Sequence, residues 1–315
     1  MLLQSKLASA WVICLIFFAH KSMGQPNDSA EPMEPIIGYG DALILGLVEG
    51  VTEFLPISST GHLILTNEWL LEASSMNQVQ LDAVNAYSIV IQAGAIVAVA
   101  LIYARRIIAL VLGILGFDPV GRRLAINLIA AFVPAALLGP LLDEKIEAVL
   151  FGATPVAVAL ILGAIFMSWA ERRKKNVERI DGDRGKDLED LSLKDSFIVG
   201  LLQCVAMCPG TSRSMMTIVG GYFVGLSRRH AAEFSFLLGL VTLTAAAGYK
   251  VLTRGRALVE NLDFGPMVFG CLVAGIAAGF SVRWLVGYLA SQGLGLFVWY
   301  RLILGLLLLL QIYLF

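Results

Sequence analysis

Long apolar segments separated by short polar ones make up most of this 315-residue chain. Six of them run for about 20 residues, the length that an α-helix needs to cross the hydrocarbon core of a bilayer. The pattern therefore predicts an all-α, polytopic integral membrane protein. In chain order the predicted spans cover residues 83–103, 124–142, 153–170, 230–250, 266–288 and 297–314.

Two further apolar segments, residues 36–71 and 195–225, are interrupted near the middle by Pro56 and Pro209. Proline removes a backbone donor and clashes with the preceding helical turn, so each segment is better described as two half-helices. A half-helix of this length is too short to span a bilayer. We therefore expect two re-entrant helical hairpins, whose tips can lie at membrane depth only where protein buries them or where they line a cavity.

The two hairpins are related by a constant offset. Glu49 aligns with Gln203 and Ser58 with Ser212, each pair 154 positions apart (203 − 49 and 212 − 58). Each half of the chain has one hairpin followed by three crossings, an odd number, so the second half should run through the membrane in the opposite direction. The sequence thus predicts an inverted-topology repeat, a fold whose binding site usually lies near the midplane where the broken helices meet.

The first 35 residues lie outside this repeat. A basic start, a short apolar run, and Ser22 and Gly24 at positions −3 and −1 of a cleavage site are typical of a signal peptide over residues 1–24. An uncleaved first transmembrane helix is the alternative, because the two differ only in length and flanks. The remaining parts are an extracytoplasmic linker, residues 25–35, a first repeat, residues 36–170, a cytoplasmic basic loop, residues 171–194, and a second repeat, residues 195–315.

Composition supports the membrane assignment. Hydrophobic residues make up 58% and charged residues 15%, with a mean hydropathy of +0.80, against about 45–50% and 25% in soluble domains. The net charge of −1 gives no reason to expect a nucleic-acid partner. Lysine and arginine concentrate in the loops assigned to the cytoplasm, among them residues 171–194, Arg283 and Arg301, which places both chain ends outside by the positive-inside rule.

Two acidic residues, Glu49 and Glu53, lie one helical turn apart in the first hairpin. Like charges at this spacing repel each other, and in apolar surroundings one must stay protonated or both must bind a cation. Hard divalent cations such as Mg²⁺ or Ca²⁺ take carboxylate oxygens and keep open positions for phosphate. We predict a metal site at Glu49 and Glu53, with a protonated pair as the alternative.

Polar residues follow Pro56 at the start of the second half-helix. Ser58, Ser59 and Thr60 lie where free backbone N–H groups and the helix dipole favour an anion, although helix capping also explains such residues. His62 can share a helix face with Ser59. Close to two carboxylates and three hydroxyls, His62 is a candidate catalytic residue, with simple packing as the alternative.

Arg213 stands at the tip of the second hairpin. A guanidinium beside free backbone donors forms a fork for phosphate oxygens. An ion pair with Glu49 or Glu53 is the alternative, and the two roles are compatible. Together the tips suit cleavage of a phosphoanhydride on a substrate with a lipid tail. The residues expected to bind its phosphates are Ser58, Thr60, Gln203, Gly210, Ser212, Ser214 and Thr217.

Three runs carry a family resemblance: residues 49–62 (E-x-x-x-E-F-L-P-I-S-S-T-G-H), 209–217 (P-G-T-S-R-S-x-x-T) and 232–238 (A-E-F-S-F-L-L). They resemble the undecaprenyl-diphosphate phosphatase family of the bacitracin-resistance type, and the similarity covers about residues 36–314. The resemblance implies a bacterial plasma-membrane phosphatase that removes the terminal phosphate of undecaprenyl diphosphate. Recycling of the lipid carrier for peptidoglycan and other envelope polymers, dependence on a divalent cation and bacitracin resistance follow from it.

The resemblance also implies roles for single residues. Glu49 and Glu53 match the acidic motif of the family, Ser59 and His62 match its nucleophile candidates, and Arg213 matches its phosphate-binding arginine. We expect Ser59 to be the nucleophile, activated by Glu53, with Arg213 stabilising the phosphoryl charge and His62 protonating a leaving group or restraining Ser59. Attack by His62 or by metal-bound water stays open.

The expected site opens to the extracytoplasmic side, because the first hairpin enters from there. A transporter of the lipid carrier is the rival function, since inverted repeats with broken helices are also a transporter architecture. Membrane lipids surround either kind of protein, and the sequence leaves a homodimer and a monomer equally open.

Overall fold

The computed structural model describes residues 36–181, 185–260 and 262–314. Eleven α-helices contain most of these residues, with two short 3-10 helices and one isolated β-bridge as the other regular structure. The predicted signal peptide and linker, residues 1–35, lie outside the described residues. The α-helices are α2 Tyr39–Thr52, α3 Ser59–Leu71, α4 Gln78–Ile102, α5 Ala104–Ile114, α6 Pro119–Leu150, α7 Ala153–Asp181, α8 Leu193–Val205, α9 Arg213–Phe223, α10 Arg228–Glu260, α11 Phe264–Gln292 and α12 Gly295–Leu314.

Six of these helices are long and apolar enough to cross a membrane: α4, α6, α7, α10, α11 and α12. Each predicted span overlaps one of them. Large apolar side chains on their outer faces are exposed, for example Leu101 and Phe280, both at 72%, as expected of a surface that faces lipid rather than water. The prediction of an all-α, polytopic membrane protein is confirmed.

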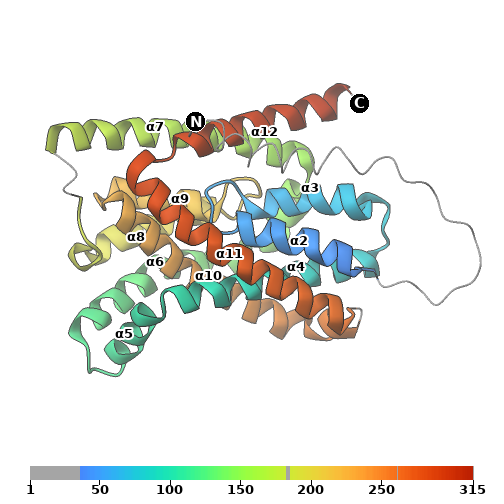
Figure 1. Cartoon of the computed structure of the whole chain (residues 1–315), viewed down its shortest axis with the longest axis horizontal. Helices are drawn as coiled ribbons and strands as arrows, with labels where there is room; N and C mark the ends of the chain where they lie inside the picture. The colour runs from blue at the N-terminus through green and yellow to red at the C-terminus, as the bar shows by residue number, and fades with distance from the viewer. Residues whose placement is uncertain (1–35, 182–184, 261, 315) are drawn as a thin grey trace, which may run out of the picture. The chain divides into compact units, whose positions relative to one another are not determined.

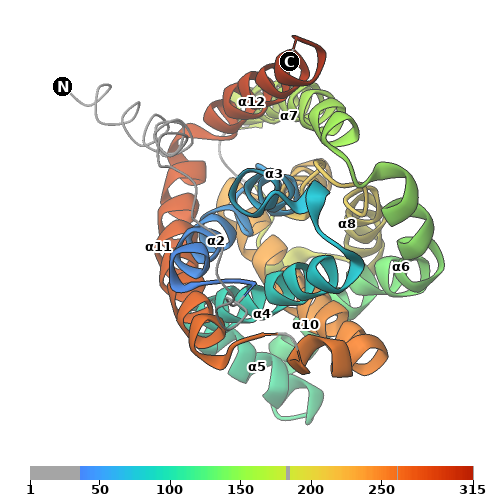
Figure 2. The same cartoon turned by 90° about the vertical axis from the view of Figure 1, so that its right-hand side faces the viewer.

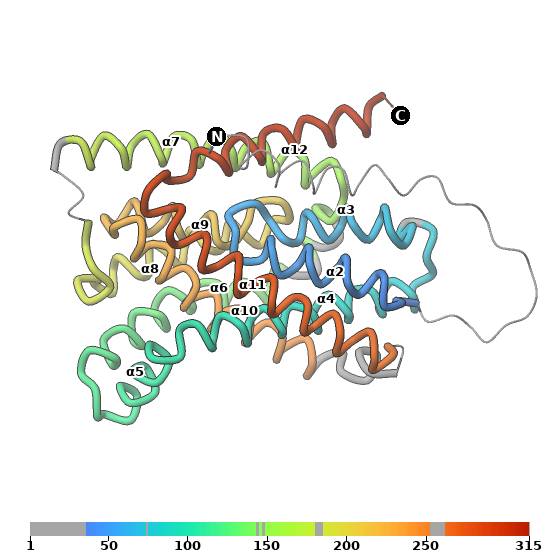
Figure 3. Tube along the Cα trace, viewed as in Figure 1, coloured from blue at the N-terminus to red at the C-terminus, as the bar shows by residue number. Residues whose placement is uncertain are grey.

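The two proline-interrupted segments form helical hairpins, α2–α3 and α8–α9. Their helices have 14, 13, 13 and 11 residues, too few to span ~30 Å of hydrocarbon at ~1.5 Å per residue. Figure 1 shows the α2–α3 hairpin on the right and the α8–α9 hairpin on the left, with their tips directed at each other, and the trace in Figure 3 shows the same arrangement. The tips are in contact, because the Ser214 hydroxyl donates to the Leu55 carbonyl at 2.7 Å.

The helices of the two halves pack reciprocally. Helix α2 lies along α11 of the second half, α8 lies along α6 of the first half, and α7 lies beside α12 (Figure 2). Gly46 and Gly200, which occupy aligned positions, make the close approaches. A Cβ added to Gly46 would lie 2.6 Å from the carbonyl oxygen of Gly270, and one added to Gly200 would lie 2.2 Å from that of Ala131. This reciprocity agrees with a duplication, and the inverted direction of the second half stays a prediction.

Buried apolar side chains surround the tips. The largest cluster includes Phe54 next to the first tip, Met215 and Ile218 on α9, and Phe234 and Phe236 on α10, all at 0% exposure. The Phe54 and Phe236 rings meet edge to face, with their centroids 5.8 Å apart. Because close-packed interiors allow little displacement, this cluster fixes where the polar residues of the tips lie.

Two features differ from what the hydrophobic pattern suggests. Helix α5 was not predicted. It follows α4 after Tyr103 alone and packs against α6. Because α5 is also rich in apolar residues, the hydrophobic pattern does not show where α4 ends and α5 begins. The assignment of Arg301 to a cytoplasmic loop is wrong, because Arg301 lies within α12 and is fully buried, at 0% exposure.

Candidate active site

The two hairpin tips have the same local backbone. Ser58 and Ser212 cap α3 and α9, and each has a φ of 76°, in the left-handed region that residues other than glycine rarely adopt. Each side chain accepts a hydrogen bond from the backbone N–H three residues on, Gly61 in one case and Met215 in the other, both at 3.3 Å. Strained conformations of this kind concentrate at functional sites. Because Ser58 and Ser212 are the caps, helix α3 begins at Ser59 and helix α9 begins at Arg213.

The Glu53 carboxylate joins the two tips. The Ser59 hydroxyl donates a short hydrogen bond to Oε2 of Glu53, and Nη2 of Arg213 donates to Oε1 at 3.1 Å. Arg213 is held further by the Ser235 carbonyl, which accepts from Nη1 at 3.2 Å, and its guanidinium lies 5.4 Å from the Phe54 ring centroid. One carboxylate thus orients a hydroxyl from the first half and a guanidinium from the second.

A cavity of about 200 Å³ opens at this junction. Both tips line it, together with α4, α6, α8 and α10, so the polar groups of Glu53, Ser59 and Arg213 face a common space. The predicted site residues among its lining are Glu53, Ser58, Ser59, Thr60, Gln203, Gly210, Ser212 and Arg213, and the other lining residues are Gln92, Ala135, Ala206, Met207, Cys208, Thr242 and Leu243.

Four predicted site residues lie outside this lining: Glu49, His62, Ser214 and Thr217. Nδ1 of His62 is 2.6 Å from the Ser58 carbonyl oxygen, and Nε2 is 2.6 Å from the hydroxyl of Tyr300, whose ring stacks on the imidazole. Ser214 donates to a carbonyl of the first tip, as described above. The Thr217 hydroxyl lies 2.6 Å from that of Ser235. These contacts join the tips to the surrounding helices.

Glu49 lies one turn before Glu53 and is 1% exposed. Neither of its carboxylate oxygens accepts a well-formed hydrogen bond among the described residues, although the carboxylate interacts with the Gln92 amide. Buried carboxylates are normally paired or bound to a metal, so these two oxygens fit a cation. In the described part of the chain no group of three or more His, Cys, Asp and Glu side chains lies together. A cation at Glu49 and Glu53 would therefore need water or phosphate oxygens to complete its shell.

Arg301 ties both tips to α12 and α7. Its guanidinium donates to the carbonyl oxygens of Pro56 at 3.4 Å, Gly210 at 2.9 Å and Ala159 at 3.1 Å. A buried guanidinium needs such acceptors, and here two of them, Pro56 and Gly210, belong to the two hairpin tips. Arg301 is thus a positioning residue for the site.

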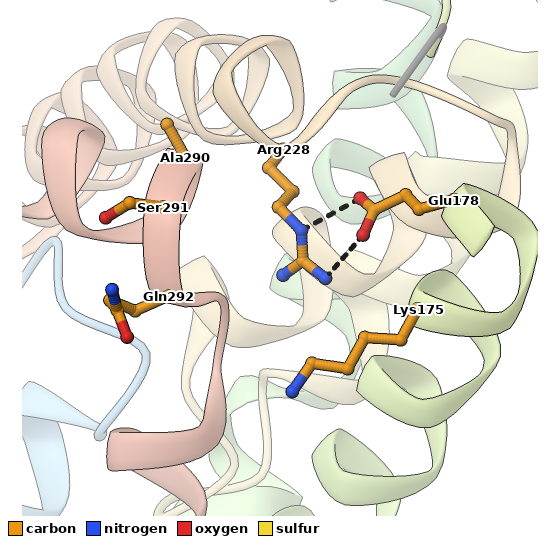
Figure 4. Close-up of a pocket in the computed structure, with 6 residues that line it drawn as sticks. All are labelled: Lys175, Glu178, Arg228, Ala290, Ser291 and Gln292. Carbon is orange, nitrogen blue, oxygen red and sulfur yellow. Dashed lines mark hydrogen bonds and ion pairs between the residues drawn. The ribbon is translucent and has the colours of Figure 1, made fainter. Parts of the chain in front are cut away.

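A second and larger cavity, of about 400 Å³, lies near the start of α10 (Figure 4). Its arginine, Arg228, is already paired: Nε and Nη2 donate to Glu178 at 2.8 and 2.9 Å, and Nη1 donates to Glu171 at 3.0 Å. Its serine, Ser291, donates to carbonyls of its own helix. With its arginine neutralised and no free nucleophile, this cavity suits catalysis less than the smaller one. It is lined by Lys175, Glu178, Arg228, Ala290, Ser291 and Gln292.

Comparison with known proteins shows the family of the chain. The family model described as bacitracin resistance protein BacA matches residues 42–307. The chain belongs to the BacA family. It is 44% identical to undecaprenyl-diphosphatase 2 of Rhodospirillum rubrum over 268 residues, covering 85% of this chain and 93% of that protein. It is also 44% identical to undecaprenyl-diphosphatase 1 of Chromobacterium violaceum, covering 85% and 94%, and 42% identical to the undecaprenyl-diphosphatase of Janthinobacterium sp., covering 89% and 97%.

Four residues that contact or line the candidate site are not among the site residues predicted from the sequence: Gln92, Thr242, Tyr300 and Arg301. Two of them carry a signal that could have found them. Gln92 is an amide in the middle of an apolar span, and Arg301 is a lone arginine within another. Polar groups at membrane depth indicate function. Thr242 and Tyr300 carry no such signal, because single threonines and tyrosines are common in membrane helices.

Proposed function

We propose that this protein hydrolyses the terminal phosphate of undecaprenyl diphosphate, giving undecaprenyl phosphate and inorganic phosphate. The observation that carries the proposal is the Glu53 carboxylate, which contacts the Ser59 hydroxyl with one oxygen and Arg213 with the other at a cavity between the two tips. The relatives named undecaprenyl-diphosphatase support the substrate. Apolar helices around the cavity suit its prenyl tail.

Ser59 is the nucleophile in this proposal. Its oxygen bonds to the terminal phosphorus, its proton passes to Oε2 of Glu53, and the bond from that phosphorus to the bridging oxygen breaks. The bridging oxygen leaves with undecaprenyl phosphate and takes the proton from Glu53. Water then bonds to the phosphorus of the phosphoserine, and its proton returns through Glu53 to Ser59 as inorganic phosphate leaves. Arg213 neutralises charge on the phosphoryl oxygens in both steps.

Attack by His62 or by water remains the alternative route. The two nitrogens of His62 already contact the Ser58 carbonyl and the Tyr300 hydroxyl, which favours the restraining role over attack or proton donation. Ser59, by contrast, lines the cavity and has a carboxylate ready to take its proton.

A divalent cation, Mg²⁺ or Ca²⁺, is part of the proposal, with Glu49 and Glu53 as its protein ligands. When bound, it neutralises charge on the phosphate oxygens. The buried oxygens of Glu49, which accept no well-formed hydrogen bond among the described residues, support this assignment. Ser58, Thr60, Gly210 and Ser212 contribute hydroxyl and backbone groups to phosphate binding in the same cavity.

The cellular setting is also proposed rather than observed. The protein lies in the bacterial plasma membrane with its site opening outward and both chain ends outside, as the distribution of basic loops suggests. Carrier recycling and bacitracin resistance follow from that activity. The rival function, transport of the carrier, is not favoured, because the relatives are named as diphosphatases and a transporter has no need of a Ser59–Glu53 pair.

Phosphate release from undecaprenyl diphosphate by detergent-purified protein tests the proposal, with and without EDTA. We expect cation-dependent release that Ser59→Ala and Arg213→Ala each reduce by roughly 10²–10³-fold. Ser281→Ala is the matched control, because its hydroxyl donates only to the Ala277 carbonyl on α11. Absence of release from folded wild-type protein would contradict hydrolysis. Full activity of Ser59→Ala would eliminate the serine nucleophile alone.

A further inference from the structure

We propose that Gln203, oriented by Thr242, forms a second phosphate subsite that binds the lipid-bound phosphate of the substrate. This subsite makes the protein select prenyl diphosphates over single phosphates. The inference rests on the proposed function, since it assigns the two phosphates of a diphosphate to different parts of one cavity.

Gln203 is a buried amide with an unused donor. The residue is 3% exposed, and its Nε2 has no hydrogen-bond partner among the described residues. A buried donor without an acceptor costs free energy, and native proteins seldom leave one unpaired. Because Gln203 lines the same cavity as Ser59 and Arg213, the missing acceptor is expected from whatever fills that cavity.

Thr242 holds the other end of this amide. Its hydroxyl shares its proton between Oε1 of Gln203, at 3.1 Å, and the Leu238 carbonyl one turn earlier on α10, at 2.8 Å. The contact to Leu238 fixes the threonine side chain, and the contact to Oε1 fixes which end of the amide is free. With the carbonyl end held on α10, the NH₂ end is left to a ligand.

The free donor serves a phosphate other than the reacting one. The transferred phosphoryl group must lie at Ser59 and Arg213, which begin α3 and α9, whereas Gln203 belongs to α8. No hydrogen bond joins Gln203 to Glu53, Ser59 or Arg213 in the part of the chain that is described. A diphosphate, which has two phosphates, can contact both groups of residues at once.

A neutral donor also suits the phosphate that stays on the product. An arginine here would add a full positive charge and a second N–H donor, and would therefore retain the lipid monophosphate more strongly after cleavage. An amide orients that phosphate without adding charge. The aligned position in the first half is Glu49, whose carboxylate would repel phosphate and which serves the cation instead.

Binding of inorganic phosphate and of pyrophosphate, measured by calorimetry on the purified full-length protein, separates the two subsites. Pyrophosphate fills both, and phosphate fills the Arg213 subsite. We expect Gln203→Met to weaken pyrophosphate binding by about 10-fold, the worth of one hydrogen bond to a charged group, and to leave phosphate binding unchanged. Methionine keeps the length of the side chain, and the Thr242 hydroxyl keeps the Leu238 carbonyl as its acceptor.

Thr242→Val is a second variant that leaves Gln203 in place. Loss of the orienting hydroxyl should weaken pyrophosphate binding by about 3-fold, again without an effect on phosphate. The matched control is Gln292→Met, at an exposed amide in the other cavity. For turnover, KM for farnesyl diphosphate should rise in Gln203→Met while kcat changes little.

Equal pyrophosphate affinity in wild type and Gln203→Met would overturn the subsite, as would parallel losses for phosphate and pyrophosphate, which indicate general damage. Failure of the proposed function would give a different set of results from failure of the subsite. Wild-type protein would then release no phosphate, while the pyrophosphate affinities of the variants would still decide the role of Gln203.

Discussion

The two hairpin tips share a backbone and differ in chemistry. Ser58 and Ser212 have the same φ and the same cap, but the residues that follow them are Ser59 in one tip and Arg213 in the other. Five positions before these caps, Glu53 is aligned with Met207 at the same offset of 154 positions. In the proposed mechanism the first half therefore supplies carboxylates and the nucleophile, and the second half supplies the positive charge. Neither half has a complete site, which explains why the tips must meet.

The largest effect should come from Glu53. Glu53→Gln removes the proton acceptor of Ser59 and the partner of Arg213 together, and we expect phosphate release to fall by about 10³-fold, within the range for loss of a general base. The aligned change in the second half, Met207→Gln, is the control. It places the same amide at the corresponding point of the other tip, where it lines the same cavity but replaces no hydrogen-bond partner of Ser59 or Arg213. It should therefore cost much less activity than Glu53→Gln.

If Met207→Gln proved as damaging as Glu53→Gln, the division of labour between the tips would be wrong. A folded Glu53→Gln protein with wild-type turnover would show that Ser59 needs no carboxylate, and water or His62 would replace it as the attacking group.

A second comparison concerns Glu49 and its aligned residue Gln203. Glu49→Gln gives both halves the same amide and removes one of the two expected metal ligands. We expect the cation concentration that half-restores activity after EDTA treatment to rise by about 10–100-fold. Titration of Mg²⁺ and Ca²⁺ into chelator-treated protein measures this shift. An unchanged titration curve would remove Glu49 from the cation site, and its buried oxygens would then require a proton.

His62 is aligned with Met216 at the same offset. His62→Met converts the first tip to the residue of the second and removes the contacts to the Ser58 carbonyl and to Tyr300. A restraining role predicts a loss of only about 10-fold, with an unchanged pH profile, whereas a general acid is worth roughly 10²–10⁴-fold. The pH dependence of kcat in His62→Met and in Tyr300→Phe therefore separates the two roles. Loss of one limb of the profile in His62→Met would favour proton donation.

Much of this architecture is readable from the sequence, because the informative signals are local. Apolar length identifies the membrane helices, Pro56 and Pro209 identify the breaks, and Glu53 lies only six positions from Ser59. Arg213 is recognisable because arginine is costly at membrane depth.

The rest depends on contacts between distant segments. Arg301 is recognisable as an arginine inside an apolar span, but its acceptors are the carbonyls of Pro56 and Gly210, 245 and 91 positions away. The role of Thr242 depends on Gln203, 39 positions earlier. His62 belongs to the right motif, yet its nitrogens face Ser58 and Tyr300 rather than the cavity, and no spacing rule distinguishes these directions.

The smallest effect concerns packing rather than chemistry. Gly46→Ala and Gly200→Ala each add a methyl group against the backbone of a helix from the other half, at 2.6 and 2.2 Å from a carbonyl oxygen. We expect each to lower the free energy of unfolding by about 1–3 kcal/mol, as overpacking does, with the larger loss at Gly200. Gly40→Ala on α2 is the control, because its new methyl group meets no atom within 4 Å.

Thermal unfolding in detergent measures all three variants. If the halves arose by duplication and both hairpins still pack through the aligned glycines, alanine at Gly46 and at Gly200 should each lower the thermal stability, and alanine at Gly40 should not. Sensitivity at Gly200 alone would mean that only the arginine-bearing hairpin needs close support. Since Arg213 reaches across to Glu53, an unsupported second hairpin would then also lose activity at temperatures where the protein is still folded.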